Sequence, residues 1–429
     1  MKELLEKLPF YNQAVLPYHL AQSVVAGTKY GWPAKKLKVI GVTGTNGKTT
    51  TCFMIWNMLT AAGHKTGLMT TVAWGVDRLE KQIEHMTTVD AFTLNHRMNK
   101  IFEAGAEYLV LELTSHALVQ FRALGVPIEV AVFTNLTHEH LDYHKTLENY
   151  RDAKRKLFKK AKYGVVNADD PSGKYFAMDV DEYIMYGIKQ GDLRAEKVKL
   201  EANGVKYTAK FAGGRKGKYA SGDILIKTRI PGEFNVYNSL AAVGVGKRLG
   251  LTNKQIADGI YGLKDVEGRM NLVDEGQDFT VIVDYAHTPD AIQKVFDSVR
   301  GTGKRIISLH GGAGRRDETT RPERGEILGK ESDIVIVTED DSRDEDVQKI
   351  ANGFVEGAEK VGKKMGKDLF VELDRRKAIR KAFEIAKKGD LVLVLGKGHE
   401  KTILRADGEH PFEDLKVSRE ELRKLKEAK

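Results

Sequence analysis

The 429-residue sequence predicts an α/β fold with two main domains, each built on a mainly parallel sheet. Three observations lead to this prediction. From residue 37 onwards, strand-like apolar runs alternate with helical stretches, which is typical of a parallel sheet covered by helices on both faces. A second series of the same kind begins near residue 268. The chain is also longer than one hydrophobic core usually serves, so two or three domains are expected.

The composition limits the class of protein. Hydrophobic residues make up 41% of the chain and charged residues 30%, as in ordinary soluble globular proteins. The single cysteine, Cys52, lies in an apolar stretch and excludes both a disulfide framework and a multi-cysteine zinc site. No apolar run is long enough to cross a bilayer, and residues 1–10 are charged rather than signal-like. We therefore expect a cytoplasmic protein without an integral membrane segment.

The chain is basic, with a formal net charge of +9. Such a balance suits nucleic-acid binding, and it equally suits an enzyme that handles anionic nucleotides and carboxylates. The lysines are spread along the chain, and no aromatic-rich basic motif accompanies them. We interpret most of this charge as solvated surface and expect no nucleic-acid partner.

The first predicted elements lead up to a glycine-rich turn and flank it. Residues 16–30 are predicted to form a helix that ends at Gly31 and Pro33. The apolar run 38–43 follows as a buried strand, and a helix is predicted over residues 52–62. The turn between them predicts a phosphate cradle, because glycines let backbone N–H groups close around phosphate oxygens and a helix N-terminus adds positive potential. The cradle residues are Gly44, Thr45, Asn46, Gly47, Lys48, Thr49 and Thr50.

The cradle differs from the usual P-loop spacing G-x-x-x-x-G-K-T, which would need a glycine at Val42. A chance glycine-rich turn is the alternative, but the strand before it and the helix after it favour nucleotide binding. Lys48 is expected to reach the outer phosphates, and Thr49 to ligate the magnesium that travels with ATP. The sequence thus predicts a P-loop-type central ATPase domain with a mainly parallel sheet, and ATP and Mg²⁺ as its ligands.

Later elements complete the two domains. In the first domain, further strands are predicted at residues 108–113, 130–136 and 164–167, a small antiparallel excursion at 197–230, and a helix at 238–249. In the second, strands are predicted at residues 280–284, 305–310, 334–338 and 391–396. This second series predicts a C-terminal Rossmann-like α/β domain, in which ligands bind beyond the carboxyl ends of the strands. We place the domains at residues 1–36 (a reduced N-terminal segment), 37–267 and 268–429.

Two polar segments carry candidate metal ligands. Glu112 ends a buried strand, and an acid at that place after an ATP loop is the expected second magnesium ligand. Residues 135–144 contain three histidines and two acids, and this segment is either a metal site or a polar loop, since its H-E-H order is not the H-E-x-x-H of zinc proteases. Lys154, on a basic helix predicted over residues 150–160, looks by itself like a surface lysine.

Five further segments, most of them at predicted strand ends, are hard to explain as turns alone. They are residues 232–238, 284–290, 311–317 with the following Arg321-Pro322, 340–343 and 396–400. Together with the cradle they resemble the Mur ligase family, ATP-dependent amide-forming enzymes that build the peptide of bacterial cell walls. The match runs from about residue 39 to 414 in the family's order. Gly-Thr-Asn-Gly-Lys-Thr-Thr, Asp-Tyr-Ala-His-Thr-Pro-Asp and Gly-Lys-Gly-His-Glu are specific in combination.

Within the family, the resemblance is strongest to the branch that adds the third amino acid to UDP-N-acetylmuramoyl-L-alanyl-D-glutamate in peptidoglycan synthesis. It implies that a substrate carboxylate attacks the γ-phosphate of ATP to give an acyl phosphate, which the incoming amine then attacks. Because two anions must meet, positioning and cationic screening supply most of the catalysis. By this resemblance the catalytic residues are Lys48, Lys154 and His140, and the metal ligands are Thr49, Glu112, His140 and Lys154 in carbamylated form.

The resemblance also implies binding residues for each substrate. For ATP these are the cradle residues with Asn235, Asn238, Asp284 and His287. For the acceptor they are Thr87, Thr88, Thr114, Gln120 and Arg122. For the incoming amino acid they are Arg316, Asp340, Asp341, Ser342, Arg343, Gly396 and Glu400. The expected partners are therefore a small nucleotide-sugar peptide and an amino acid, and we expect a monomer.

Three features depart from the family pattern. The family normally carries roughly a hundred residues before the phosphate loop, a length typical of a separate domain, whereas about 36 precede the strand here. We therefore expect weaker dependence on the uridine moiety of the acceptor. The family's Asp-Asn-Pro-Arg reads Asp340-Asp341-Ser342-Arg343, and its Gly-Asp-Arg-Asp reads Gly314-Arg315-Arg316-Asp317. The last two departures affect the amino-acid pocket.

Arg343 bears on which amino acid is added. In the family, arginine at this point goes with meso-diaminopimelate, whose far carboxylate suits a planar guanidinium fork. Asp341 adds a negative charge beside it, and if it paired with Arg343 the pocket would tolerate lysine or ornithine. We expect meso-diaminopimelate.

Other functions remain to be separated from this one. A glutamine-dependent amidase subunit acting on a lipid-linked muropeptide usually carries a four-cysteine zinc insertion, which one cysteine cannot provide. A folate-type polyglutamate ligase is disfavoured by the Gly-Lys-Gly-His-Glu and Asp-Asp-Ser-Arg segments. A basic P-loop NTPase that binds nucleic acid lacks a recognisable motif.

Overall fold

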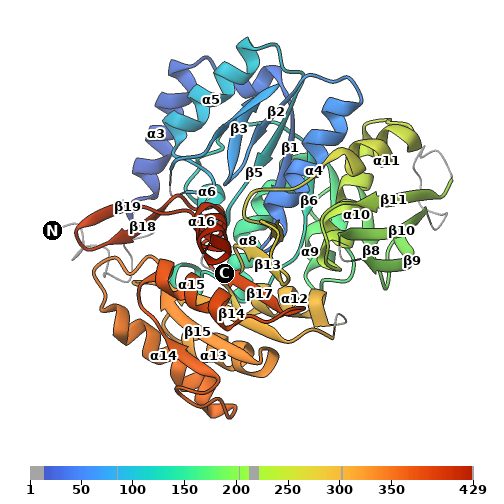
Figure 1. Cartoon of the computed structure of the whole chain (residues 1–429). Coiled ribbons are helices and arrows are strands. Elements are labelled where there is room, and N and C mark those ends of the chain that lie inside the picture. The colour runs from blue at the N-terminus through green and yellow to red at the C-terminus, as the bar shows by residue number, and fades with distance from the viewer. Residues whose placement is uncertain (1–13, 85, 202, 212–221, 301–302, 428–429) are drawn as a thin grey trace. The chain divides into compact units, whose positions relative to one another are not determined.

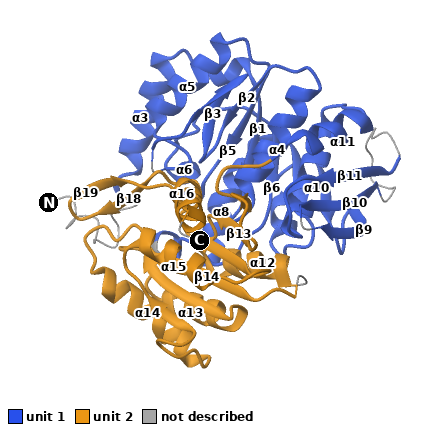
Figure 2. Ribbon diagram, viewed as in Figure 1, with its two compact units in different colours: residues 1–264 blue, residues 265–429 orange. Residues whose placement is uncertain are grey.

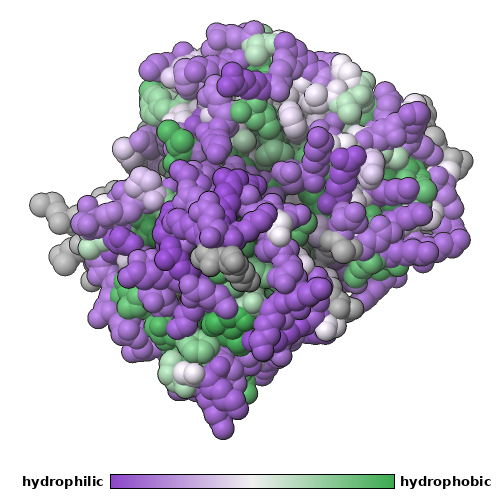
Figure 3. All heavy atoms as spheres, in the orientation of Figure 1, coloured by the Kyte–Doolittle hydropathy of each residue, from purple (hydrophilic) through white to green (hydrophobic). Residues whose placement is uncertain are grey.

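The computed structural model describes residues 14–84, 86–201, 203–211, 222–300 and 303–427. The chain forms two compact units, residues 1–264 and 265–429 (Figure 2), each with its own sheet. No helix among the described residues is long and apolar enough to cross a membrane. The face of the molecule in Figure 3 carries mostly hydrophilic side chains, as expected when most of the lysine and arginine charge is solvated.

Unit 1 contains one large sheet with the strand order β11-β10-β9-β8-β7-β6-β1-β5-β2-β3-β4 (Figure 1). Its middle strands pair in parallel: β2 (Thr66–Met69), β5 (Tyr108–Glu112), β1 (Lys38–Thr43), β6 (Ile128–Phe133), β7 (Ala161–Asn167), β8 (Glu182–Gly187) and β9 (Leu193–Glu201). The two ends of the sheet are antiparallel and consist of β3 (Ala73–Val76), β4 (Arg78–Lys81), β10 (Gly204–Phe211) and β11 (Ile224–Thr228).

Burial follows this division. β5 is buried along its whole length and β1 at every residue after Lys38, as expected for parallel strands covered on both faces. β11 alternates strictly between buried and exposed residues, so only one of its faces packs on the core. The predicted antiparallel excursion at residues 197–230 is thereby confirmed.

The helices of unit 1 connect these strands. They are α3 (Leu16–Lys29), η1 (Pro33–Lys36), α4 (Lys48–Ala61), α5 (Ala91–Glu103), α6 (Ser115–Val119), α7 (Leu141–His144), α8 (Leu147–Phe158), α9 (Gly173–Ala177), α10 (Phe234–Arg248) and α11 (Asn253–Gly262). Asp90, Thr146 and Thr252 cap α5, α8 and α11 by accepting hydrogen bonds from first-turn N–H groups.

Three helices begin earlier than the sequence predicts, and one of them is α8, which begins at Leu147 rather than residue 150. α4 begins at Lys48 rather than residue 52, because the threonines after Lys48 already form its first turn. α10 begins at Phe234 rather than residue 238, and its polar first turn is buried with the rest of the helix. A helix buried on all sides shows no amphipathic period, so its start could not be read from periodicity.

Unit 2 is a doubly wound sheet with the order β12-β13-β17-β14-β15-β16. Its strands are β12 (Asn271–Val273), β13 (Thr280–Asp284), β14 (Ile306–Gly312), β15 (Ile334–Glu339), β16 (Leu369–Val371) and β17 (Leu391–Leu395), and every pair except β12–β13 is parallel. The predicted strands of the second domain are thus present, and the α/β fold class is confirmed.

The helices of unit 2 pack next to one another in two groups, α12 (Pro289–Val299) with α13 (Thr320–Glu331) and α14 (Val347–Lys360), and α15 (Arg375–Ile385) with α16 (Asp414–Glu427). The chain reaches β16 through the first group and returns to β17 through α15, so right-handed crossovers put the groups on opposite faces. A hairpin of β18 (Thr402–Arg405) and β19 (Gly408–Pro411) precedes α16.

A buried ion pair fixes the carboxyl ends of two strands of unit 2. Arg375 and Asp414 are both fully buried, and the Arg375 Nε lies 2.8 Å from an Asp414 carboxylate oxygen. The same guanidinium donates to the carbonyl oxygens of Glu339 at 3.2 Å and Leu395 at 3.0 Å. The ends of β15 and β17, from which the second set of candidate residues projects, are therefore tied to α15 and α16.

Candidate active site

The glycine-rich turn of unit 1 lies between β1 and α4 and has a backbone that side chains would not allow. Gly44 and Gly47 have φ of 152° and 82°. A Cβ on Gly44 would stand 1.9 Å from the Thr134 hydroxyl, and one on Gly47 would stand 2.3 Å from the Asn238 amide oxygen. Both glycines are therefore required for the turn to approach its neighbours this closely.

The end of β6 holds the turn in place. The Asn46 N–H donates to the Asn135 side-chain oxygen at 2.9 Å, and the Asn135 side-chain N–H donates back to the Asn46 carbonyl at 3.0 Å. The Thr134 hydroxyl donates to the same carbonyl at 2.7 Å. A role for Thr134 and Asn135 in holding the turn was not predicted. The signal was available, because parallel neighbours such as β1 and β6 end at the same edge of a sheet.

Thr49 and Glu112 lie in contact at the start of α4. The Thr49 hydroxyl is 3.0 and 3.1 Å from the two Glu112 carboxylate oxygens. The backbone N–H and the hydroxyl of Thr71, which was not predicted, also donate to Glu112 at 3.0 and 3.1 Å. A buried carboxylate beside a hydroxyl offers the oxygen ligands that Mg²⁺ prefers, so the donor chemistry of this pair fits the ion.

Two lysines donate to carbonyls of the turn. Lys48 Nζ lies 2.7 Å from the Thr45 carbonyl oxygen, and Lys154 Nζ lies 2.7 Å from that of Gly44. Lys154 is only 1% exposed, so the interpretation of Lys154 as a surface lysine is wrong. On α8 it falls among the buried residues Tyr150, Ala153, Leu157 and Phe158, at helical spacing, and this stripe was the signal that could have placed it inside.

The environment of Lys154 disfavours its charged form. Burial and the nearby Lys48 ammonium hold the pKa of Lys154 well below its usual value. Its ammonium or amine also lies over the Tyr150 ring at 4.4 Å. A neutral amine is the form that reacts with CO₂, and the lowered pKa is compatible with the carbamate that the family resemblance implies. The carbamate itself stays a prediction.

His140 lies beside this group but packs mainly against other rings. Its Nε2 is 3.6 Å from a Glu139 carboxylate oxygen, and its ring centroid is 4.8 Å from that of His116. Burial lowers the pKa of His116 to about 3 and that of His144 to about 4, so both are neutral. Among the described residues, this segment does not gather three histidine or acid ligand atoms in one place. A metal-ligand role for His140 stays a prediction.

The candidate acceptor residues form a connected group in unit 1. The Thr88 hydroxyl accepts from the Thr114 N–H at 3.1 Å and donates to the Glu112 carbonyl at 2.9 Å. The Arg122 guanidinium donates to the Thr88 carbonyl and to the Gln120 side chain, at 2.6 Å for the latter. Thr87 lies next to them, where it lines a small cavity with Thr88.

Asn235 and Asn238 lie on α10 near the turn. The Asn238 side-chain N–H donates to the Asn235 side-chain oxygen at 2.8 Å, and the Thr51 hydroxyl of α4 donates to Asn238 at 3.3 Å. Asp284 and His287 belong to unit 2, at the end of β13. Asp284 accepts from the N–H groups of Met270 at 2.7 Å and Ala286 at 2.7 Å, and burial raises its pKa. The role of these residues at the nucleotide stays a prediction.

In unit 2, two arginines lie near each other after β14 and β15. Burial and the neighbouring Arg316 guanidinium lower the pKa of Arg343. Arg343 donates to the Gly314 carbonyl through its guanidinium, and the Gly314 N–H donates to the Asp341 carbonyl at 2.8 Å. Two guanidiniums that repel each other form a ready site for a carboxylate.

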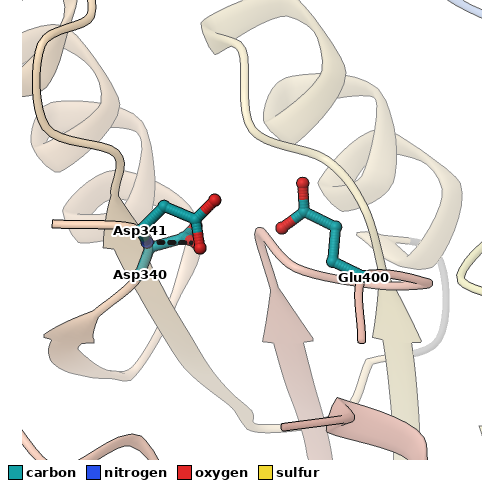
Figure 4. A group of neighbouring side chains, drawn as sticks. All are labelled: Asp340, Asp341 and Glu400. Carbon is teal, nitrogen blue, oxygen red and sulfur yellow. Dashed lines mark hydrogen bonds between the residues drawn. The ribbon is translucent and has the colours of Figure 1, made fainter. Parts of the chain in front are cut away.

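Three carboxylates gather beside these arginines. Asp340, Asp341 and Glu400 offer oxygens that all lie within 4.8 Å of one another, and Figure 4 shows Asp341 and Glu400 facing each other. Lys397, which was not predicted as a site residue, hydrogen-bonds to all three, at 3.1 Å to Asp340 and 2.8 Å to each of the others. Among the described side chains, Asp341 and Arg343 form no hydrogen bond or ion pair with each other, so the pairing that would have neutralised Arg343 is not seen. The other two predicted residues lie in the same segments. Ser342, between Asp341 and Arg343 in the sequence, is buried, and Gly396, just before Lys397, has a φ of 113°.

Comparison with known proteins identifies the class. Residues 42–246 match the family model described as the Mur ligase middle domain, and residues 268–398 match the model described as the Mur ligase, glutamate ligase domain. The chain therefore belongs to the Mur ligase family and is an ATP-dependent ligase.

Individual relatives cover most of the chain. A protein of Syntrophomonas wolfei subsp. wolfei named UDP-N-acetylmuramoyl-L-alanyl-D-glutamate–2,6-diaminopimelate ligase is 39% identical over 411 residues, which are 94% of this chain and 82% of that protein. A UDP-N-acetylmuramyl-tripeptide synthetase of Roseiflexus sp. is 39% identical over 427 residues, 95% of this chain and 82% of that protein.

Solved structures show the same fold. One of a UDP-N-acetylmuramoyl-L-alanyl-D-glutamate–2,6-diaminopimelate ligase is 29% identical, with a TM-score of 0.62 over 91% of this chain and 79% of that one. A folylpolyglutamate synthase of Mycobacterium tuberculosis has a TM-score of 0.71 at 16% identity, over 90% of this chain and 94% of that one, and shows the fold alone.

Proposed function

We propose that this ligase adds meso-diaminopimelate to an acceptor of the UDP-N-acetylmuramoyl-L-alanyl-D-glutamate type in peptidoglycan synthesis. The observation that carries the choice of amino acid is the arrangement in unit 2, where Arg343 and Arg316 lie beside Asp341 and Glu400. A pocket with both charges suits an end group that bears a carboxylate and an ammonium, and the far end of diaminopimelate has both. Lysine lacks that carboxylate. The names of relatives such as the Syntrophomonas protein support the same choice.

The reaction proceeds in two steps. A carboxylate oxygen of the acceptor attacks the γ-phosphorus of ATP, the bond to the β-phosphate oxygen breaks, and ADP leaves an acyl phosphate behind. The neutral amine of diaminopimelate then attacks the acyl carbon, phosphate departs, and the nitrogen loses a proton to complete the amide. Each step brings charged groups together, so fixed cations and dipoles that need no reorganisation lower its barrier.

Residues of unit 1 prepare the first step. The N–H groups of the glycine-rich turn and the start of α4 bind phosphate, and Lys48 turns from the Thr45 carbonyl to screen the phosphate charge. Thr49, Glu112, His140 and carbamylated Lys154 would hold magnesium, which when bound supplies further positive charge at the phosphates. Arg122, held by Gln120 and Thr88, orients the acceptor carboxylate.

Lys154 acquires its carboxylate from CO₂. The neutral Nζ attacks the carbon of CO₂ and loses one proton, which converts a cation site into an anion that can bind a metal. The remaining N–H can keep the bond to the Gly44 carbonyl that Lys154 makes in the structure. We further propose that the enzyme acts as a monomer on small-molecule substrates and works in the cytoplasm, where ATP is supplied.

The test measures ADP release with single amino acids, with and without UDP-N-acetylmuramoyl dipeptide, followed by competition between equal diaminopimelate and lysine. We expect release that requires both acceptor and diaminopimelate, and a product that contains mainly diaminopimelate. Predominant incorporation of lysine would refute the choice of amino acid. Release with a folate acceptor but not with the muramyl peptide would refute the proposed acceptor.

A further inference from the structure

Lys397 is a fully buried cation of unit 2 with three carboxylate partners. It follows Gly396 at the end of β17, and its side chain is 0% exposed. Its Nζ lies 3.1 Å from Asp340 and 2.8 Å from both Asp341 and Glu400. An ammonium has three N–H donors, and here each of them meets a different carboxylate. The three carboxylates raise the pKa of Lys397 above its usual value, so the lysine remains charged.

This pairing explains how three acids share one buried place. Oxygens of Asp340, Asp341 and Glu400 within 4.8 Å of one another would repel strongly without a cation, and such a group often holds a metal ion. The lysine ammonium supplies the cation from the chain itself. Burial raises the pKa of Glu400, but the two aspartates alone outweigh the single positive charge of Lys397. The group is therefore anionic, and this residual charge can attract the ammonium of an amino acid.

The lysine also decides what Asp341 does. Asp341 stands where the family resemblance implies an asparagine, and a carboxylate there could have paired with Arg343. Its Oδ1 instead accepts from Lys397 and from the Leu404 N–H at 3.1 Å. The backbone N–H of Arg343 donates to the Leu404 carbonyl at 2.8 Å, so Asp341 and Arg343 are both hydrogen-bonded to the backbone of Leu404 in β18. Among the described side chains, no carboxylate hydrogen-bonds to the Arg343 guanidinium.

We infer that Lys397 is a positioning residue for amino-acid selection. It holds the Asp341 and Glu400 carboxylates in place, where they can attract the substrate ammonium, and it keeps Arg343 available for a substrate carboxylate. Lys397 itself is buried behind the carboxylates and acts through them. This inference rests on the proposed function only in taking unit 2 as the site of the incoming amino acid.

The test substitutes the lysine and separates KM from kcat. In Lys397→Met, Asp341 loses its cation and turns to Arg343, so we expect KM for diaminopimelate to rise at least about tenfold, while KM for ATP changes less than about twofold. The double variant Lys397→Met with Asp341→Asn removes the unpaired charge, and we expect it to recover part of the affinity for diaminopimelate. Such rescue would not follow from a purely structural role.

Lys401→Met is the matched control. Lys401 lies four residues further on and pairs with two other acids, Glu267 and Glu413. Its loss should leave KM for the amino acid unchanged.

Lys397→Arg is a second test variant, for use if Lys397→Met fails to fold. It keeps the positive charge in a side chain of different shape, so we expect a smaller rise in KM for the amino acid than in Lys397→Met.

Two outcomes would overturn the inference. One is a loss of kcat in the Lys397 variants with KM for the amino acid unchanged. The other is the absence of rescue by Asp341→Asn in a variant that is folded. Should the wild type use lysine instead of diaminopimelate, the proposed function fails, and the same KM measurements with lysine still test the role of Lys397.

Discussion

Each unit of this ligase buries a lysine near the carboxyl ends of its parallel strands, Lys154 in unit 1 and Lys397 in unit 2, and the two have opposite surroundings. Lys154 of unit 1 donates to one carbonyl, that of Gly44, and has Lys48 as a cationic neighbour. Lys397 of unit 2 meets three carboxylates. The first therefore has a pKa well below the usual lysine value, and the second has a pKa above it.

The difference shows that burial alone does not set the role of a lysine. Desolvation disfavours the charge at both places, and the neighbours decide the outcome. At Lys154, burial and the Lys48 charge outweigh the attraction of Glu139 and Glu112, so the pKa falls and the neutral amine that carbamylation needs is favoured. With three partners, Lys397 remains a permanent cation that organises acids. The two environments therefore suit the same residue type to the two different roles proposed here, carbamylation for Lys154 and electrostatic positioning for Lys397.

The largest expected effect on amide formation comes from replacing Lys48, whose charge adds to burial in lowering the pKa of Lys154. Lys48→Ala removes the cation that screens the phosphates and the charge that depresses the pKa of Lys154. We expect amide formation to fall by about 10³-fold or more, because a preorganised charge contributes several kcal/mol to such steps. Steady-state assays measure this, and circular dichroism should show an unchanged fold. Lys162→Ala, at an exposed lysine of the same unit, is the control. Near-normal turnover in Lys48→Ala would contradict the phosphate-loop assignment.

Lys154→Ala is expected to have the next largest effect. We expect turnover to fall by about 10²-fold, as for the loss of a residue that positions a metal ion. Short carboxylates added to the buffer should restore part of the activity, since they can occupy the space of the lost carbamate. For the wild type, activity lost in CO₂-free buffer should return with bicarbonate. Lys159→Ala, an exposed lysine at the end of the same helix, should behave as the wild type. Full activity of Lys154→Ala would remove the lysine from the mechanism.

Arg343→Ala tests whether the Arg343 guanidinium, which Asp341 does not engage, binds the far carboxylate of diaminopimelate. Loss of a bidentate bond to a carboxylate costs about 1.5–3 kcal/mol, so the preference for diaminopimelate over lysine should fall about tenfold to a hundredfold. The affinity for ATP should change little. Competition between the two amino acids measures the preference, with Arg423→Ala, an arginine on α16 that pairs with Glu275, as the control. An unchanged preference would mean that another group recognises the far carboxylate.

The smallest expected effect is a difference in pH dependence between the two lysines. Between its lowered folded pKa and the ordinary lysine pKa of 10.5, the unfolded chain holds a proton at residue 154 that the folded chain lacks. The contribution of Lys154 to the free energy of unfolding therefore increases with pH, by up to about 1.4 kcal/mol per pH unit. For Lys397, whose folded pKa is raised, the contribution is fully present below 10.5 and is lost as the pH rises through the folded pKa.

Urea unfolding in CO₂-free buffer at several pH values between about 7 and 10 measures both contributions. The stability of the wild type relative to Lys154→Met should rise across this range. Its stability relative to Lys397→Met should stay constant. Parallel behaviour of the two variants would contradict the assignment of opposite charge states.

The sequence predicted the fold class and the phosphate turn because both depend on local patterns. Alternating apolar runs marked the parallel strands, and glycines with a lysine marked the turn at residues 44–50. The partners of that turn were harder to predict. Asn135 and Thr71 act through contacts between strands distant in the sequence, so the available signal was not a local pattern but the expectation that parallel strands end at the same edge of the sheet.

The charge states could not be predicted from the sequence, because they depend on what surrounds a side chain. By itself Lys154 looked like a surface lysine, and only the family resemblance gave it a catalytic role, although its spacing with Tyr150 and Leu157 placed it on the apolar stripe of α8. Lys397 lay inside the recognised segment Gly-Lys-Gly-His-Glu and was passed over. Only the fold brings β15 and β17 close enough for Asp340, Asp341 and Glu400 to surround it.

The most direct test of the contrast between the two lysines is carbon-13 NMR of the protein equilibrated with ¹³C-bicarbonate near neutral pH. A carbamate forms only on a neutral amine, so the spectrum should contain one carbamate signal that disappears in Lys154→Ala and persists in Lys397→Met. Absence of the signal in the wild type, or its persistence in Lys154→Ala, would contradict the account.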